Sequence, residues 1–282
     1  MIVDSHIHFW EDEFPEKVWI RRKIAALGRR FTPDDLKPLM QAAGIDGVVL
    51  VQAAPEEAET RYFLEIADKE DIALGVVGWV NLEDGVERLG ASLDAFQRHP
   101  KFKGVRNHPP REFDGSWLRD PKAKRGYAQL AERGLPCDLM VTCRQLADTR
   151  ELLLEVPDLT AVINHGGRPS VMAGELEPWA SDMRAIADDT KAFVKVSGLI
   201  ERASQEWTAE SVRPWVEFLL EAFGGERLIF GSNWPVMTIM GTYGGWWEAL
   251  QDMLDTIGAP AADRKALLGG TATKVYRLDG AD

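Results

Sequence analysis

Two histidines, His6 and His8, stand one residue apart near the start of the chain, inside a short apolar run. Because side chains alternate along a β-strand, Asp4 is expected to share their face, while Val3 and Ile7 face the surrounding helices. Two imidazoles at this spacing can reach one divalent cation or one oxygen atom of a substrate. The pattern indicates a site for a metal ion or a polar ligand, with a solvated strand end as the alternative.

Three later apolar runs also end in side chains that could take part in chemistry. His165 ends one run and precedes two glycines, which permit a ligand to approach closely. Arg106 ends another, and its rigid, permanently charged guanidinium binds carboxylates and polarised carbonyls; an ion-paired residue at the rim is the alternative. Asn233 ends a third and could present its amide to a ligand, although asparagine also suits turns. We expect His165, Asn233 and Arg106 to be catalytic.

Four other side chains near these run ends are expected to bind the substrate. His108 and Arg168 follow two of the runs closely, and Trp10 and Trp234 lie near two others. An indole ring can stack on a flat or sugar-like ligand, and packing in the core is the alternative for each tryptophan.

Lys195 lies in the middle of an apolar run, between Val194 and Val196. A buried charge without a partner is strongly unfavourable. We therefore expect Lys195 to form a structural ion pair inside the protein, with a carboxylate such as Asp4, in preference to a catalytic role.

These side chains need a scaffold that gathers distant segments, and the hydrophobic pattern predicts one. Nearly continuous apolar runs are typical of strands buried on both faces of a parallel sheet, and here eight of them alternate with amphipathic segments. The pattern predicts an α/β fold, a single (β/α)₈ TIM barrel over residues 1–282, with its chemistry at the carboxyl ends of the strands. The expected strands lie within residues 1–9, 47–53, 73–81, 102–108, 135–142, 160–166, 192–199 and 227–233, and expected helices include 57–67, 86–96, 126–133, 144–154, 178–187, 212–223 and 246–257.

Composition narrows the class of protein. The 282 residues include 45 acidic and 33 basic side chains, a formal net charge of −12, which argues against a nucleic-acid partner because duplex binding needs a basic face. No apolar stretch is long enough to cross a membrane, and no secretory signal is evident, so no membrane partner is expected. The two cysteines, Cys137 and Cys143, make no disulfide framework and indicate a reducing cytoplasm. A homo-oligomer stays open as an alternative to a monomer.

Taken together, six motifs resemble the amidohydrolase superfamily, and more closely its lactonase-like branch of sugar-acid lactonases and pyrone dicarboxylate lactonase. The resemblance runs over nearly the whole chain, and the order of the motifs is specific to the superfamily while saying less about the substrate. The motifs are VDSHIHF at 3–9, KGVRNHP at 103–109, VINHGGRP at 162–169, VKVSGL at 194–199, FGSNWPV at 230–236 and GGTATKVYRL at 269–278.

The resemblance implies a metal centre with departures from the common pattern. In metal-using relatives, the positions of His6, His8 and His165 surround one or two divalent ions, and an acid after strand eight activates water. Asn233 stands at that acid position here, and residues 140–142 supply no bridging ligand for a second ion. We therefore expect one divalent ion, with zinc favoured, held by the three histidines, and keep catalysis without metal as the alternative, since some lactonases of this branch need none.

The expected function is hydrolysis of a small lactone by an activated water, with a sugar-acid lactone such as rhamnono-, fucono- or galactonolactone as the small-molecule substrate. Arg106, or a cation held by the three histidines, would stabilise the oxyanion, and a neutral histidine would accept the proton of a water oriented by Asn233. Two alternatives stay open. One is a zinc-dependent decarboxylase of an unsaturated or aromatic carboxylic acid, and the other is a non-catalytic ligand-binding protein.

Overall fold

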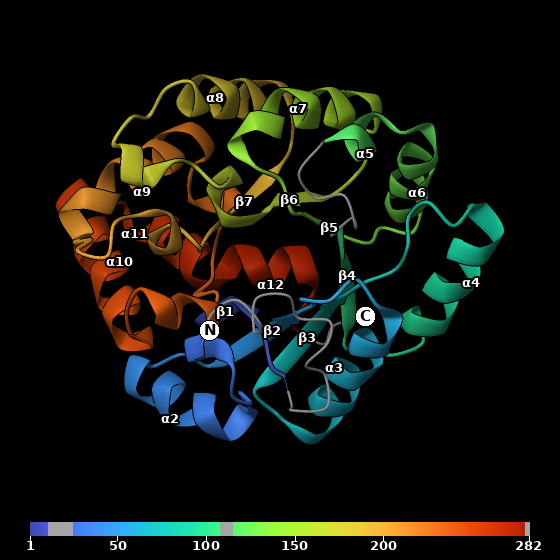
Figure 1. Cartoon of the computed structure of the whole chain (residues 1–282), viewed down its shortest axis with the longest axis horizontal. Helices are drawn as coiled ribbons and strands as arrows, with labels where there is room; N and C mark the ends of the chain where they lie inside the picture. Colours follow the sequence, from blue (N-terminus) through green and yellow to red (C-terminus); the bar gives the residue numbers. More distant parts are fainter. Residues whose placement is uncertain (11–24, 108–114, 280–282) are drawn as a thin grey trace.

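Eight parallel strands form one sheet in chain order in the computed structural model, which describes residues 1–10, 25–107 and 115–279 (Figure 1). Each strand lies inside one of the eight apolar runs expected from the sequence. The strands are β1 (Val3–Ile7), β2 (Gly47–Val51), β3 (Ala73–Gly78), β4 (Phe102–Asn107), β5 (Cys137–Leu139), β6 (Ala161–Ile163), β7 (Phe193–Val196) and β8 (Leu228–Phe230).

Hydrogen bonds between the first and last strands close this sheet into a barrel. The Ser5 hydroxyl donates to the carbonyl of Phe230 at 2.5 Å, and the backbone amide of Asn233 donates to the carbonyl of His6 at 3.0 Å. Just beyond the two strands, the backbone amide of His8 donates to the carbonyl of Trp234 at 2.9 Å. The predicted (β/α)₈ barrel is confirmed, and closure brings the segments after β8 beside those after β1.

The helices surround the strands as an outer ring (Figure 1). Capping residues define their ends: Pro33 opens α2, Gly44 ends it with a φ of 67°, and Asp120 caps α6 by accepting from the amide of Lys122. That cap starts α6 five residues before the expected segment. The helices are α2 (Pro33–Ala43), α3 (Glu57–Lys69), α4 (Val86–Gln97), α5 (Ser116–Arg119), α6 (Pro121–Glu132), α7 (Leu146–Glu155), α8 (Trp179–Asp189), α9 (Ala209–Phe223), α10 (Tyr243–Ile257), α11 (Ala261–Lys265) and α12 (Thr271–Tyr276).

Helix α12 packs against the interior of the barrel at the amino-terminal ends of the strands. Its residues Val275 and Tyr276 join one apolar cluster with inward residues such as Val49 and Val162, whereas the larger core lies between the strands and the other helices. Because α12 covers this end, the polar side chains at the carboxyl ends are left as the place where a ligand can enter.

The expected faces of β1 are wrong at its start. The pairing of β1 with β2 shifts register between Asp4 and Ile7, which is an irregularity that reverses the alternation of side chains. Val3 therefore packs in the interior cluster with α12, and the Asp4 carboxylate faces outward, where Tyr243 of α10 donates to it at 3.0 Å. Beyond the shift, His6 of β1 and His8, which follows the strand, both face the interior, as expected.

Two simpler expectations can also be compared with the fold. Cys137 and Cys143 are both free thiols, which agrees with the expected lack of a disulfide framework. Among the described residues, no helix has both the length and the apolar character needed to span a bilayer.

Candidate active site at the carboxyl ends of the strands

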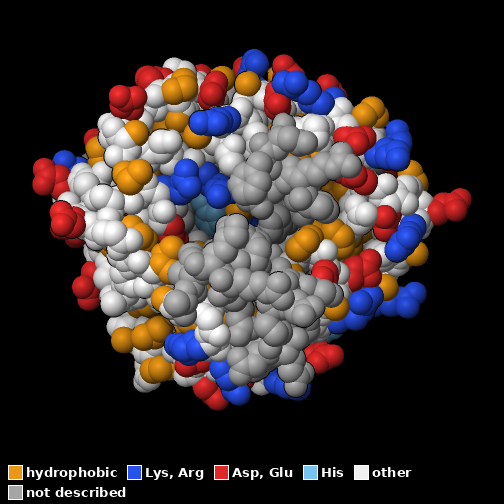
Figure 2. Space-filling model, in the orientation of Figure 1, with side chains coloured by type: hydrophobic (Ala, Val, Ile, Leu, Met, Phe, Trp, Pro, Cys, Tyr) orange, Lys and Arg blue, Asp and Glu red, His pale blue; other side chains and the backbone are white. Residues whose placement is uncertain are grey.

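Three imidazoles meet at the carboxyl ends of the strands. The ring centroids of His6 and His8 are 4.9 Å apart, and that of His165 lies 4.5 Å from that of His6. All three side chains are at most 5% exposed. Figure 2 shows a histidine at the bottom of a hollow on this face, beside Lys or Arg side chains. The structure thus brings together side chains that stand up to 159 positions apart in the sequence.

The turn after β6 carries His165 in a strained backbone conformation. Its φ of 55° and ψ of 40° lie in the left-handed region, which costs a residue with a Cβ about 1–2 kcal/mol. Two glycines leave room for the imidazoles: a Cβ on Gly198 would lie 2.5 Å from His165 Nδ1, and one on Gly231 would lie 2.7 Å from the Cβ of His6. Strain of this kind, kept in place by close packing, is common in binding and catalytic sites.

Lys195 is buried and paired as expected, but its carboxylate partner is Asp138. Its Nζ donates to Asp138 Oδ2 at 2.6 Å and to the carbonyl of Ser5 at 2.8 Å, and it lies 3.3 Å from His6 Nδ1. The register shift in β1 turns Asp4, the expected example of a partner, away from Lys195 and toward Tyr243. Asp138 is the one carboxylate within residues 135–142, and a buried charge in an apolar run is the signal that could have identified it.

These contacts determine which ring nitrogen of His6 carries the proton. The Asp138 carboxylate accepts from Lys195, from Tyr276 and from Asn164. Burial lowers the pKa of Lys195 and the ion pair with Asp138 opposes that shift, so we assign Lys195 as an ammonium with three hydrogens. With two of these hydrogens used by Asp138 and Ser5, the third is available to His6 Nδ1 at 3.3 Å, and we assign Nδ1 as its acceptor. Burial and the charge of Lys195 hold the pKa of His6 well below its usual value, so the ring is neutral and its proton sits on Nε2. That N–H is buried and has no hydrogen-bond partner among the described residues.

In His8 the ring proton lies on Nδ1, the other ring nitrogen from that in His6. Its Nδ1 donates to the carbonyl of Val51 at 2.6 Å, and burial together with the charge of Arg106 lowers its pKa to about 3. The neutral ring therefore presents a lone pair at Nε2, 3.3 Å from Oδ1 of Asn233. The amide Nδ2 of Asn233 donates to Glu201 at 2.6 Å. Asn233 has a φ of 62°, a conformation that asparagine tolerates well.

Arg106 lies beside His165 and is only 3% exposed. Its Nε donates to Asn164 Oδ1 at 2.9 Å and its Nη1 to the carbonyl of Gln52 at 2.8 Å. The remaining nitrogen, Nη2, is 3.5 Å from His165 Nε2, which leaves Nδ1 of that ring to donate to Ser197 at 2.9 Å. Burial, followed by the charge of Arg106, holds the pKa of His165 well below its usual value. The same Nη2 also lies 3.1 Å from the sulfur of Met140, so these contacts hold the guanidinium in one orientation beside the imidazoles.

The four expected substrate contacts have different outcomes. Arg168 follows the turn that carries the third imidazole and is partly exposed, which suits the mouth of the site. His108 lies outside the described residues. Trp10 and Trp234 are 1% and 2% exposed, and both rings pack edge-on against Phe31. Packing is the role that the structure shows for these tryptophans, and their contact with a substrate stays a prediction.

The residues around the imidazoles do not fit a tightly held divalent cation. The described residues include no group of three or more His, Cys, Asp or Glu side chains placed to hold a metal ion. In the tautomer assigned above His6 Nε2 carries a proton, which a metal ion would have to displace before it could bind that nitrogen. Two buried cations, Lys195 and Arg106, also lie beside the rings, and their positive charge disfavours a divalent cation there.

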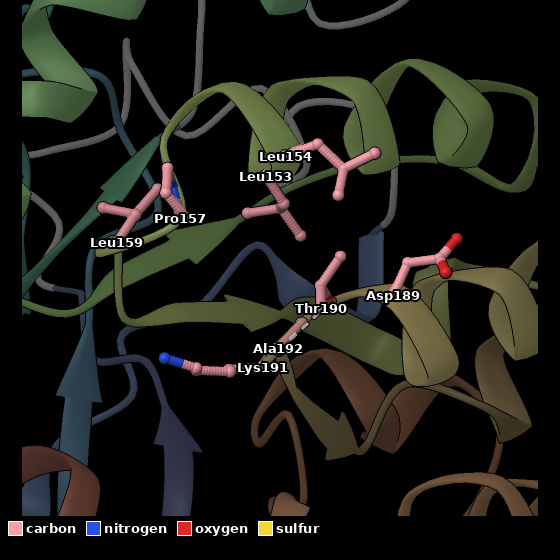
Figure 3. A pocket seen from close by; sticks show the side chains of 8 residues that line it. All are labelled: Leu153, Leu154, Pro157, Leu159, Asp189, Thr190, Lys191 and Ala192. Atoms are coloured by element: carbon pink, nitrogen blue, oxygen red, sulfur yellow. Dashed lines mark hydrogen bonds between the residues drawn. The ribbon is translucent and has the colours of Figure 1, made fainter.

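A separate pocket of about 100 Å³ lies at the other end of the barrel (Figure 3). Its lining precedes β6 and β7, with Leu153, Leu159 and Ala192 on its apolar side and Asp189 and Lys191 at its edge. No imidazole contributes to it. The pocket is therefore no competitor to the site at the carboxyl ends.

Comparison with known proteins identifies the family to which this chain belongs. The model of the family described as Amidohydrolase matches residues 3–278. An L-fucono-1,5-lactonase of Burkholderia ambifaria is 32% identical over 280 residues, which cover 98% of this chain and 96% of that protein. A crystal structure of an amidohydrolase from Burkholderia multivorans with bound Zn is 30% identical, with a TM-score of 0.91 and 99% of each chain covered. A putative 2-pyrone-4,6-dicarboxylic acid hydrolase from Pseudomonas putida is 25% identical, with a TM-score of 0.74 and 99% and 98% covered.

Proposed function

Because the chain belongs to the amidohydrolase family, we propose that it is a hydrolase that opens a small sugar-acid lactone. One observation carries the proposal: a lone pair at His8 Nε2 and two hydrogen-bond donors, His6 Nε2–H and Arg106, converge in one buried site. Ester hydrolysis needs both a proton acceptor for water and donors for the oxyanion. The similarity to an L-fucono-1,5-lactonase over nearly the whole chain supports this substrate class.

The first step is the addition of water to the lactone carbonyl. His8 Nε2 takes one proton from water while the water oxygen bonds to the carbonyl carbon, and the displaced electron pair moves to the carbonyl oxygen. Arg106 and the Nε2–H of His6 stabilise that oxyanion, because both donors are buried and already oriented. The sequence left open which neutral histidine accepts the proton; the Nε2 of His165 lies beside an N–H of Arg106, so His8 is the better acceptor.

The second step opens the ring. The oxyanion re-forms the carbonyl, the bond between the carbonyl carbon and the ring oxygen breaks, and the proton on His8 passes to the leaving alkoxide. The products are the hydroxy acid and the original, neutral His8. A ring ester is a reactive electrophile, so an imidazole whose burial lowers its pKa to about 3 can serve as a weak base.

The tautomer of His6 and the two neighbouring cations favour catalysis without a resident metal. Arg106 takes the place that a Lewis acid would have beside the carbonyl oxygen. The Burkholderia multivorans structure has bound Zn, and that observation concerns that protein.

The test is a pH-stat screen of the purified protein with fucono-, galactono- and rhamnonolactones. We expect acid release on at least one lactone, equal rates after dialysis against a chelator, and no stoichiometric Zn by elemental analysis. Carbon dioxide release from aromatic or unsaturated acids would favour a decarboxylase, and tight lactone binding without turnover would favour a binding protein. Complete loss of turnover on chelation, restored by Zn, would contradict the metal-free mechanism alone.

A further inference from the structure

We infer that Glu201 is a positioning residue for this reaction: it turns the Asn233 amide so that Oδ1 and His8 Nε2 together hold the attacking water. The inference rests on the proposed lactone hydrolysis. Glu201 follows β7 in a short 3-10 turn, Ile200–Arg202, and nothing in its local sequence pattern marks it as part of the site.

Glu201 decides which end of the Asn233 side chain faces the imidazole. A side-chain amide has a donor end and an acceptor end. The ionised carboxylate of Glu201 can only accept, and it takes a hydrogen from Asn233 Nδ2 at 2.6 Å. The oxygen Oδ1 is thereby directed to the other side, 3.3 Å from His8 Nε2.

The result is an acceptor pair with no hydrogen between its members. His8 donates its one ring N–H to the carbonyl of Val51. Neither His8 Nε2 nor the Asn233 oxygen therefore carries a hydrogen that it could donate to the other. Two adjacent acceptors are satisfied together by a water molecule that donates one hydrogen to each. A water bound through both hydrogens presents its lone pairs to the opposite side, where they can attack a carbonyl carbon.

The environment of Glu201 argues against a purely structural role. Its second oxygen, Oε2, is buried and has no hydrogen-bond partner among the described residues. Burial raises the pKa of Glu201 to about 7, and the hydrogen bond from Asn233 opposes that rise. The adjacent Arg202 directs its Nε to the carbonyl of Pro169 at 3.5 Å and not to this carboxylate. A buried, half-satisfied carboxylate lowers stability, so a function is the better reason for its presence.

The geometry also explains how the chain can use asparagine after β8. An aspartate at position 233 could itself take a proton, whereas Asn233 can only direct one. In this arrangement His8 takes the proton from water. The Glu201 carboxylate, on the turn after β7, acts through the Asn233 amide that it orients.

The experiment compares Glu201→Met, Glu201→Gln and the control Glu206→Met, which changes an exposed glutamate on the same segment. Met keeps the length of the side chain but accepts no hydrogen bond, so the Asn233 amide is free to turn. We expect kcat for the best lactone to fall at least about tenfold with KM within about twofold, and thermal stability to be unchanged or raised. Gln retains an accepting oxygen, and it should restore part of kcat.

Each outcome bears on one claim. Wild-type kcat in Glu201→Met would overturn the positioning role while leaving lactone hydrolysis in place. A lower melting temperature, with kcat and KM changed alike in Glu201→Met and Glu201→Gln, would show a structural role and also overturn it. A wild-type protein that opens no lactone would remove the proposed function, and with it the reaction that Glu201 is inferred to serve.

Discussion

Gly198 is the most direct test of whether the position of the His165 ring controls turnover. Gly198 has a φ of +62°, and a Cβ built on it would lie 2.5 Å from His165 Nδ1 and 2.9 Å from its Cβ. Ordinary contacts begin near 3.4 Å, so Gly198→Ala must push the ring by about 1 Å, away from its hydrogen bond with Ser197. Because the other ring nitrogen contacts Nη2 of Arg106, the same movement disturbs the donor proposed for the oxyanion. A displacement of this size costs about 100-fold in rate, or roughly 2.7 kcal/mol in the activation barrier.

The same substitution also strains the backbone, and a control separates the two effects. An alanine in the left-handed region costs about 1–2 kcal/mol of stability wherever it is placed. Gly44, at the end of α2, has a φ of +67° and open space around its Cβ position, and it lies at the opposite end of the barrel. Gly44→Ala should therefore lower stability by a similar amount and leave kcat unchanged.

The assay is initial-rate hydrolysis of the best lactone substrate, measured beside denaturant unfolding for both variants. Gly198→Ala is expected to lose about 100-fold in kcat while remaining folded. If Gly198→Ala keeps the wild-type kcat, or if Gly44→Ala loses as much activity, then the position of the His165 ring does not control turnover and the reasoning is refuted.

Three further predictions concern charge and pH. Arg106→Lys should lower kcat about 10²–10³-fold in lactone assays, because lysine cannot keep the bonds to Asn164 and Gln52 while facing the oxyanion; a full rate would exclude Arg106 from that role. Since the ionised carboxylate of Glu201 holds the amide more strongly than the neutral acid does and its pKa is raised to about 7, kcat/KM should rise with pH through about 7, and Glu201→Gln should flatten that rise in a pH–rate profile. Burial lowers the pKa of His8 from 6.5 to about 3, so the unfolded state binds more protons between these values; this contribution to stability is complete above about pH 6.5 and is lost as pH falls toward 3. Urea unfolding at pH 7 and pH 5 measures that loss, and His8→Gln should reduce the difference between the two pH values.

The strands were predictable because their signal is local. A run such as residues 47–53 is apolar on both faces, and only a position between the helices and the barrel interior buries both. The expected run contained β2 in full, from Gly47 to Val51. Boundaries were less certain where a cap or a turn decides them: β6 ends at Ile163, and His165 lies in a left-handed turn beyond the strand.

The candidate site was predictable in the identity of its imidazoles and unpredictable in their chemistry. Parallel strands in one barrel place all carboxyl ends on one face, so His6, His8 and His165 had to lie on the same side. Which nitrogen of each ring carries a proton depends on contacts such as that of Lys195 with His6, 189 positions away. Glu201 was missed because an acid in a turn resembles a solvated residue until its burial is known.

The sequence by itself determined the order of strands and helices, the barrel and the presence of three histidines at its mouth, because periodicity and capping act over a few neighbouring residues. Only the tertiary structure decided that Lys195 pairs with Asp138, that the register of β1 shifts after Asp4, and that Glu201 stands behind Asn233. These choices follow from burial. A charged or polar group removed from water must find its partner among whichever side chains the closed barrel brings next to it, and sequence distance places no limit on that partner.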